Sequence, residues 1–313
     1  MAGERSTPFD PQEWHNVQPP ESMDISRRFE YDEDHLQLLR KWLRLDEPNT
    51  IVEIGCGSGF FTEKLAAMSP ESEITGIEPD EFLRKYVEGK GIKRAKFIKG
   101  SAEEIPLPTG FADLTVCHIV LYNLPNVPMA VAEMARVTRD GGIVAAIEPI
   151  GRSVNYHPDP HLNELFEKAQ KAFGRGIWEL RSKEMYDRSP PRGWQARYPE
   201  IFRDCDLENV EVHGLLSTFL LSDSRWKRED IVSWMKERLD FEERDEERTR
   251  VVLKRGGMDD DTIEMVIRVN SDYLRGLIDD PDRISETHEL EVLGRIIIIG
   301  FKKSPHENPP NTN

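Results

Sequence analysis

Apolar residues in the first half of the chain form short runs that alternate with segments of helical periodicity. The runs predict strands, and the segments between them predict helices, because apolar residues recur there every three or four positions. Strands that alternate with helices favour crossover units, a parallel sheet and a doubly wound arrangement. The expected strands are about 51–54, 74–77, 95–99, 112–117 and 143–147, and the expected helices are about 32–45, 59–68, 81–88 and 127–138.

The pattern changes after residue 150. One helix is expected before a stretch rich in glycine and proline, which predicts a long irregular segment. Two further strands then enclose two strongly charged helices, which we interpret as a pair packed on the domain; a lid over the substrate and a dimer contact are the alternatives. In chain order these segments are about 160–173 (helix), 174–200 (irregular), 210–221 (strand), 228–255 and 260–278 (helices) and 292–301 (strand).

The chain is therefore expected to form one α/β domain with a helical insertion before its last strand. Residues 1–25 lack periodicity and predict a flexible N-terminal arm, and 304–313 predict a disordered polar tail. The rest is expected to form a core over 26–222, a helical insertion over 223–290 and a last core strand over 291–303.

Charge and cysteine content narrow the class of function. The net charge is −16, with 58 acidic and 42 basic residues, so nucleic acid is a disfavoured partner. No apolar run is long enough to span a bilayer, and the polar N-terminus resembles no targeting signal, so a cytoplasmic location is expected. The three cysteines, Cys56, Cys117 and Cys205, lack metal-ligand spacing and predict free thiols and no metal site.

The turn after the first expected strand carries the strongest signal. Glu53 on that strand is followed by Gly55–Gly59, in which glycine stands at every second position. Small residues let the backbone turn sharply and approach a ligand, and the next helix presents unpaired N–H groups. A nicotinamide dinucleotide fingerprint would need Gly or Ala at Phe60. The alternation therefore favours a ligand without phosphates lying directly on the turn; a nicotinamide oxidoreductase and a purely structural turn are the alternatives.

Polar residues follow the next strands at the same expected edge of the sheet, where doubly wound folds bind ligands. Glu78 closes the second strand, and its carboxylate can accept hydrogen bonds from a ribose 2′- and 3′-hydroxyl pair. Residues 101–103 follow the third strand, and their polar groups could form hydrogen bonds with the edge of an adenine. The alternatives are a solvated acid at the strand end and an ordinary loop. The sequence therefore favours a nucleoside ligand at this edge.

These motifs together resemble one known family. The resemblance is to class I S-adenosylmethionine-dependent methyltransferases, in the broad UbiE-like, type 11 group. It covers about residues 45–150. The combined pattern is specific to the superfamily and gives almost no information about the substrate. The segments that carry it are Glu53–Gly59, Glu78, Ser101–Glu103, Phe111–Leu114 and Arg139–Gly142.

The resemblance implies a Rossmann-like, mainly parallel, seven-stranded sheet whose last strand is antiparallel and lies beside 210–221. It implies that S-adenosylmethionine lies on the glycine turn, with Glu53 near its amino group, His118 near the reactive methyl, and Ile77 and Pro79 beside the adenine. This group often has a histidine where Asn123 stands. The cofactor-binding residues so expected are Glu53, Gly55, Cys56, Gly57, Ser58, Gly59, Glu78, Pro79, Ser101, Ala102, Glu103 and His118.

Methyl transfer is a direct displacement that needs a base only when the acceptor carries a proton. The candidate catalytic residues are His118 and Tyr122, with packing and cofactor contact as the alternatives. Weaker candidates follow the fifth strand, and Tyr31 could cover the cofactor. Aromatic residues of the second half could line an apolar substrate pocket or pack the insertion. The weaker candidates are Glu148 and His157, and the aromatic residues are Trp178, Trp194, Tyr198 and Trp226.

The sequence thus predicts a methyltransferase that uses S-adenosylmethionine as methyl donor and a small molecule as acceptor. One alternative is the same chemistry on a protein or RNA. Another is a non-catalytic module that binds the cofactor and works through its charged helices. The charged helical insertion is also a candidate surface for a homodimer.

Overall fold

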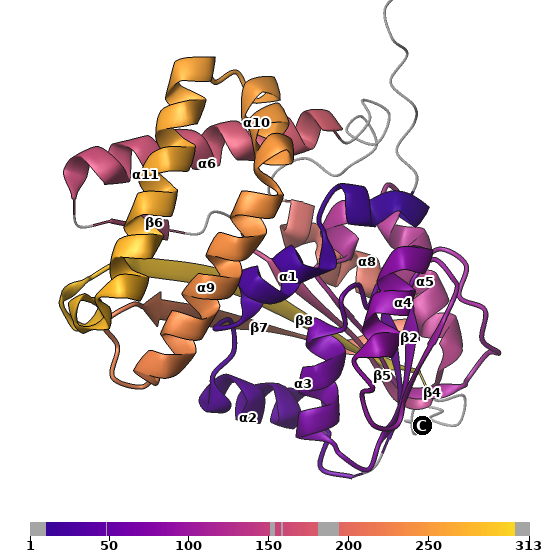
Figure 1. Cartoon of the computed structure of the whole chain (residues 1–313). Helices are drawn as coiled ribbons and strands as arrows, with labels where there is room; N and C mark the ends of the chain where they lie inside the picture. Colours follow the sequence, from indigo (N-terminus) through magenta and orange to yellow (C-terminus); the bar gives the residue numbers. More distant parts are fainter. Residues whose placement is uncertain (1–10, 48, 151–153, 158, 181–193, 304–313) are drawn as a thin grey trace, which may run out of the picture. The chain divides into compact units, whose positions relative to one another are not determined.

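The computed structural model describes residues 11–47, 49–150, 154–157, 159–180 and 194–303 (Figure 1). The chain divides into two compact units. The sheet unit comprises 31–151, 188–216 and 294–313, and the helical unit comprises 1–30, 152–187 and 217–293.

The strands of the described ranges form one eight-stranded sheet in the order β3-β2-β1-β4-β5-β8-β6, with β7 also paired to β8. Strands β1 to β5 pair in parallel, and β8 pairs antiparallel with β5. Short β6 pairs with the first residues of β8. The strands are β1 (Thr50–Ile54), β2 (Glu73–Ile77), β3 (Ala95–Ile98), β4 (Ala112–His118), β5 (Thr138–Pro149), β6 (Val154–Tyr156), β7 (Leu207–Leu220) and β8 (Leu290–Lys302).

The strand order confirms the predicted doubly wound, Rossmann-like sheet with an antiparallel last strand. The seven expected strands are present, and β6 adds one that the sequence analysis did not predict. The order reverses between β1 and β4, so the ligand-binding crevice of such a sheet lies at the carboxyl ends of these two strands. All four residues of Ile51–Ile54 are buried, as expected of a central parallel strand covered on both faces.

Helices cover both faces of the sheet. One face packs against α5 and α8, through residues such as Val131 and Phe202. The other packs against α2 and α3, through residues such as Leu39 and Phe61. The bounds in the sheet unit are α2 (Glu33–Trp42), α3 (Phe60–Met68), α4 (Glu81–Gly89), α5 (Val127–Val137) and α8 (Tyr198–Asp204), with short 3-10 helices η2 (Leu121–Asn123) and η3 (Trp194–Arg197).

Polar side chains at their N-caps begin several of these helices. Asp32 accepts from the backbone of His35, whose side chain in turn accepts from the Asp32 backbone, so α2 begins with a reciprocal capping box. Asp80 caps α4, and Asn126 caps α5. Such caps stabilise a helix by about 1 kcal/mol each.

The helical unit is built around two apolar clusters. In one, Ile231 and Met235 of α9 pack against Leu274 and Leu277 of α11. In the other, Ala172 of α6 packs against Leu253 of α10 and Ile263 of α11. Figure 1 shows α1 beside α9 and α6 beside α10, in agreement with their contacts. The bounds are η1 (Pro11–Asn16), α1 (Pro20–Arg27), α6 (Pro160–Leu180), α9 (Arg228–Arg244), α10 (Glu246–Arg255), α11 (Asp260–Asp279) and η4 (Pro281–Glu286).

The expected boundaries are wrong in three places. Residues 11–25, expected in a flexible arm, form η1 and most of α1, because Met23 is buried and the indole of Trp234 donates to the Ile25 carbonyl. Residues 174–180, expected to be irregular, continue α6, and 194–204 are also helical. The helical unit also takes in α1 and α6, beyond the expected insertion over 223–290. The expected tail over 304–313 lies outside the described residues.

No helix in the described ranges is both long enough and apolar enough to cross a membrane.

Candidate active site

The turn from β1 into α3 takes the sharp path that its glycines predict. Gly55, Gly57 and Gly59 have φ values of 64°, 53° and 83°, in the left-handed region that side chains disfavour. A Cβ on Gly55 would lie 2.6 Å from Val120 Cγ2, and one on Gly59 would lie 2.3 Å from Val87 Cγ2. Two of the three glycines are therefore required by the protein's own packing. This packing gives Gly55 and Gly59 a structural reason to be glycine, and the expectation that a ligand lies on the turn stays a prediction.

Glu78, at the end of β2, lies directly against this turn. Its Oε2 accepts from the Gly57 backbone at 2.9 Å, and its Oε1 accepts from the Asp80 backbone at 3.1 Å. The guanidinium of Arg84 donates to the carbonyls of Glu78 and Pro79. Each oxygen of the Glu78 carboxylate can accept a further hydrogen bond, so the carboxylate can also bind the two hydroxyls of a diol. The structure thus brings the strand-two carboxylate and the strand-one turn together, as the sequence analysis expects.

Glu53, at 1% exposure, is the second buried acid of the crevice. The hydroxyl of Thr62, on α3, donates to its Oε2 at 2.5 Å. Burial raises the pKa of Glu53 to about 8 and that of Glu78 to about 7, and the Glu78 charge adds to the shift of Glu53. Burial and these two carboxylates raise the pKa of the neighbouring Cys56 thiol. Ionising both acids at neutral pH therefore costs free energy that a positively charged ligand would offset.

The raised pKa of Glu53 has a measurable effect on stability. The folded protein retains a proton there that the unfolded chain loses above about pH 4.5, so this contribution to stability is lost as pH rises toward about 8. We expect Glu53→Gln without ligand to be more stable than the wild type by at least about 1 kcal/mol at pH 8.5 and nearly equal to it at about pH 4. Urea denaturation across this range measures the difference. A constant difference would contradict the assignment.

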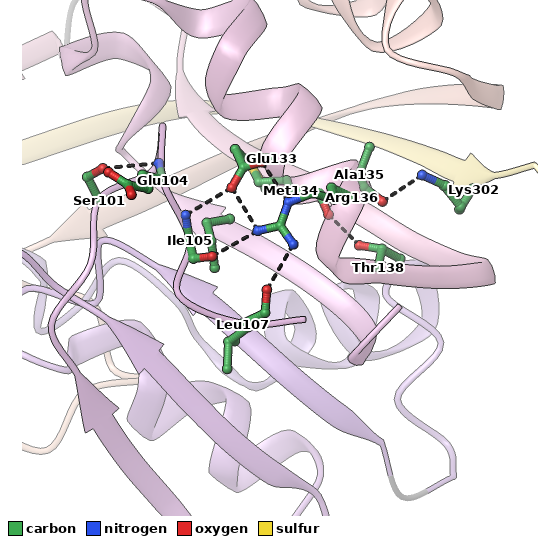
Figure 2. Close-up of polar contacts among 10 residues, drawn as sticks. All are labelled: Ser101, Glu104, Ile105, Leu107, Glu133, Met134, Ala135, Arg136, Thr138 and Lys302. Carbon is green, nitrogen blue, oxygen red and sulfur yellow. Dashed lines mark hydrogen bonds and ion pairs between the residues drawn. The ribbon is translucent and has the colours of Figure 1, made fainter. Parts of the chain in front are cut away.

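The loop after β3 is fixed to α5 by one arginine (Figure 2). Arg136 donates to the carbonyls of Leu107 and Ile105 and forms an ion pair with Glu133. Glu133 in turn accepts from the Ile105 backbone at 3.0 Å. These bonds fix residues 105–107 to α5 and so anchor the C-terminal end of the segment that contains residues 101–103.

The expected adenine-edge residues occupy the beginning of this loop. Ser101 Oγ accepts from the Glu104 backbone at 3.1 Å (Figure 2). Ala102 is buried in the core. Glu103 is half-buried; burial raises its pKa, and a hydrogen bond from the Asn126 backbone opposes the shift. Pro79 stays partly exposed, whereas Ile77 is fully buried in the core. Ile77 therefore has a packing role in the core, and its expected place beside an adenine stays a prediction.

Glu148, near the end of β5, organises the backbone that follows β4. Its Oε1 accepts from the amides of Val120 at 3.0 Å and Leu121 at 2.8 Å, and its Oε2 accepts from Tyr122 at 3.1 Å. The carboxyl is fully buried, and burial raises its pKa to about 7. These bonds give Glu148 a role in supporting the loop, and its candidacy as a base stays a prediction.

His118, the last residue of β4, is buried in an aromatic cluster. Its Nε2 lies 2.9 Å from the Tyr31 hydroxyl, and its ring stacks on Phe61 with centroids 4.8 Å apart. The ring of Phe60 lies 6.0 Å from it. The hydroxyl and the imidazole are hydrogen-bonded, and the tautomer of the imidazole decides which of them donates. Tyr31 thus contacts the candidate catalytic histidine.

The residue after His118 has a strained backbone. Ile119 has a φ of 58°, which a β-branched side chain rarely adopts. Its amide donates to the Ile147 carbonyl at 2.8 Å, and its carbonyl accepts from the Asn123 side chain at 2.9 Å. The strain is held by these bonds, and such strain is concentrated at functional sites. Asn123, where the related group often has histidine, therefore supports the loop.

Other candidates lie elsewhere in the described chain. Tyr122 follows the strained residue and is partly buried. Tyr198 is buried in the core of the sheet unit. His157 and Trp226 belong to the helical unit, where His157 is buried beside Tyr273. Trp178 lies on α6 and Trp194 on η3, and their side chains lie outside the described part.

Sequence reasoning missed two members of the site. Thr62 contacts Glu53, and its place one helical turn after the glycine turn was the available signal. Phe61 stacks on His118, but the sequence pattern predicts only that it is an apolar residue on the buried face of the helix. Across the described ranges, no group of three or more His, Cys, Asp or Glu side chains is arranged to hold a metal ion.

Comparison with known families agrees with this geometry. A family model described as a methyltransferase domain matches residues 52–146, which run from β1 through most of β5. The matched region contains the glycine turn, both buried acids and the loop after β3.

Curated relatives match over part of their length. An uncharacterized methyltransferase of Schizosaccharomyces pombe is 27% identical over 188 residues, which are 57% of this chain and 63% of that protein. The demethylmenaquinone methyltransferase of Geobacillus stearothermophilus is 31% identical over 31% of this chain and 44% of its own length. That of Geobacillus kaustophilus is 28% identical over 51% of this chain and 71% of its own. The chain thus spans less than two thirds of the first two relatives.

Solved structures share the fold at low identity. A chain from a complex with the Haloferax volcanii Trm112 methyltransferase activator has a TM-score of 0.53 and 13% identity, covering 96% of this chain and all of that one. Haemonchus contortus phosphoethanolamine N-methyltransferase 2, with S-adenosylhomocysteine bound, has a TM-score of 0.50 and 11% identity, covering 95% and 61%. The sheet order, the glycine turn and the family match together show that the chain contains a class I S-adenosylmethionine-dependent methyltransferase domain.

Proposed function

We propose that this protein transfers the methyl group of S-adenosylmethionine to a small-molecule acceptor, with the donor bound in the crevice of the sheet unit. The observation that carries the proposal is the pair of buried carboxylates, Glu53 and Glu78, on either side of a glycine turn. S-adenosylmethionine carries an ammonium and a sulfonium, so it offsets the cost of ionising both acids. A nicotinamide dinucleotide would place phosphates against the same two charges, which electrostatic repulsion disfavours.

The residues that follow β1, β2 and β3 are suited in turn to the methionine, ribose and adenine parts of the donor. We assign Glu53 to the amino group, Gly57 to the methionine backbone and Glu78 to the ribose diol. Pro79 and the loop that begins at Ser101 flank the adenine. The other residues assigned to the donor are Gly55, Cys56, Ser58, Gly59, Ala102, Glu103 and His118.

Catalysis in this proposal depends mainly on alignment. S-adenosylmethionine supplies a methyl group on a sulfonium, whose sulfur takes the electron pair of the broken bond and leaves as a neutral thioether. The chain's own residues hold the acceptor in line with that methyl and exclude water, which can lower a barrier by roughly 7–11 kcal/mol. Where the acceptor carries a proton, His118 takes it, with Tyr31 orienting the imidazole and Tyr122 at the wall of the crevice.

A small-molecule acceptor is supported by the charge of the chain. A net charge of −16 opposes binding to RNA, whose phosphates need a basic surface. Relatives named for demethylmenaquinone fit the same class, although their identity to this chain is below one third.

Methyl incorporation tests the proposal. The purified protein is incubated with a cell extract and S-adenosylmethionine labelled on its methyl group, and the extract is then separated into small metabolites and macromolecules. We expect label in the small-metabolite fraction, and Glu78→Ala should abolish it. Label in protein or RNA would instead favour a macromolecular acceptor. Tight donor binding without labelled product would favour a non-catalytic module.

A further inference from the structure

A second candidate binding site lies within the helical unit, apart from the glycine turn. It is a cavity of about 20 Å³ between α1, α9 and the portions of β7 and β8 that belong to this unit. A space of this size admits a water molecule or an ammonium group and little more. The cavity is therefore suited to the head of a ligand whose remainder lies outside it.

Aromatic rings form one wall of the cavity. Phe29 and Phe219 line it and are stacked, with centroids 4.5 Å apart and planes at 5°. The ring of Trp234 meets both edge to face at 5.5 Å, and its indole N–H is committed to the Ile25 carbonyl at 3.0 Å. Aromatic faces attract cations through their quadrupole, most strongly when the cation is desolvated.

The polar side chains of the cavity are acids and a hydroxyl. Glu30 is 2% exposed, and Glu291 is partly buried. Ser217 is also 2% exposed, and its hydroxyl has no hydrogen-bond partner within the described ranges. A buried hydroxyl without a partner costs free energy, so its position indicates a ligand that supplies the missing bond.

Two acidic side chains, Glu30 and Glu291, line the cavity. No residue that lines the cavity in the described chain is basic. Arg238 lies nearby, with its guanidinium 5.6 Å from the Trp234 ring centroid, and its charge interacts with Glu291. Arg238 also forms an ion pair with Glu242 at 2.7 Å, so its charge is shared among several acids.

We propose that this cavity binds the ammonium group of a primary alkylamine. Such a group has three N–H donors, which match the Ser217 hydroxyl and the carboxylates of Glu30 and Glu291, and its charge suits the aromatic wall. The inference does not depend on the proposed methyl transfer, because the site and its test involve the helical unit alone.

The test uses two ligands of the same shape that differ in charge. The full-length protein is titrated with propylammonium chloride, and with 1-propanol at matched ionic strength, while the indole N–H signal of Trp234 is followed by NMR and assigned with Trp234→Phe. We expect a saturable shift with propylammonium, in the millimolar range, and none with 1-propanol. Tetramethylammonium, which has no N–H donor and is too large for the cavity, should not saturate the signal.

Two variants and a control locate the binding. Glu30→Gln keeps the size of the side chain and should weaken propylammonium binding by about tenfold, and Ser217→Ala by about threefold. Glu229→Gln, at an exposed position of α9, should leave it unchanged. Equal response to the charged and neutral ligands, or no saturable response to either, would show that the cavity holds only water and would overturn the proposal. Unchanged affinity in both cavity variants would do the same.

Discussion

Glu78→Ala is expected to weaken S-adenosylmethionine binding by at least about a hundredfold, since the proposed bonds from the ribose diol to this carboxylate are charge-assisted and contribute about 1.5–3 kcal/mol each. The variant also loses the acceptor that holds the Gly57 amide, so the turn itself becomes less well ordered. Isothermal titration calorimetry with the purified protein measures the loss directly.

A matched control lies on the same strand. Glu73 begins β2, is exposed, and pairs with Arg94 at the surface. Glu73→Ala should bind the donor with wild-type affinity, because an exposed ion pair contributes little and does not touch the crevice. Wild-type affinity in Glu78→Ala would contradict the proposed donor site. Gly57→Val is a less informative variant, because a branched side chain at a φ of 53° strains the backbone whether or not a ligand is present.

His118→Gln is expected to lower kcat by about 10²–10⁴-fold for an acceptor that must lose a proton, which is the usual contribution of a general base. Donor affinity should fall by much less than kcat, because His118 is one of several residues assigned to the donor and the contacts at Glu53 and Glu78 remain. Steady-state kinetics with the acceptor found by methyl labelling gives kcat, and calorimetry gives donor affinity. Equal losses in both would indicate a role in donor binding and contradict a role in the transfer step.

Tyr31 and His213 supply the comparisons for this variant. Tyr31→Phe keeps the ring that packs in the aromatic cluster and removes the hydroxyl 2.9 Å from His118 Nε2. If Tyr31 orients the imidazole, its loss should lower kcat by about tenfold, change the pH–rate profile and add little to His118→Gln in the double variant. His213 stacks on Trp42 with centroids 4.4 Å apart, so His213→Gln removes a comparable ring without affecting turnover.

The order of elements could be predicted from the sequence because each signal is local. The apolar run Ile51–Ile54, the glycines after it and Glu78 at the end of the next strand all lie within short windows whose periodicity or spacing is readable. Parallel pairing then brings the ends of β1 and β2 to one edge, where the Gly57 amide donates a hydrogen bond to the Glu78 carboxylate. Sequence and topology together therefore place the two halves of the crevice.

Contacts between distant segments could not be predicted in the same way. Glu148 lies near the end of a strand that is buried on both faces, so no alternation shows that its carboxyl turns inward to the amides of Val120–Tyr122. The N-terminal segment lacks helical periodicity, and its partner, Trp234, lies more than two hundred residues away. The spacing of Gly55 and Gly59 likewise did not reveal that Val120 and Val87 fill the space beside them.

Three backbone N–H groups of the loop after β4 donate hydrogen bonds to Glu148, so the path of this loop does not depend on its own side chains. The carboxyl holds the main chain of Val120, Leu121 and Tyr122, and none of these bonds uses a side chain of the loop. Substitutions at Tyr122 can therefore alter the chemistry of the crevice wall while the backbone keeps its path. Proteins with such a carboxylate can therefore change their substrate specificity through this position at little cost in folding stability.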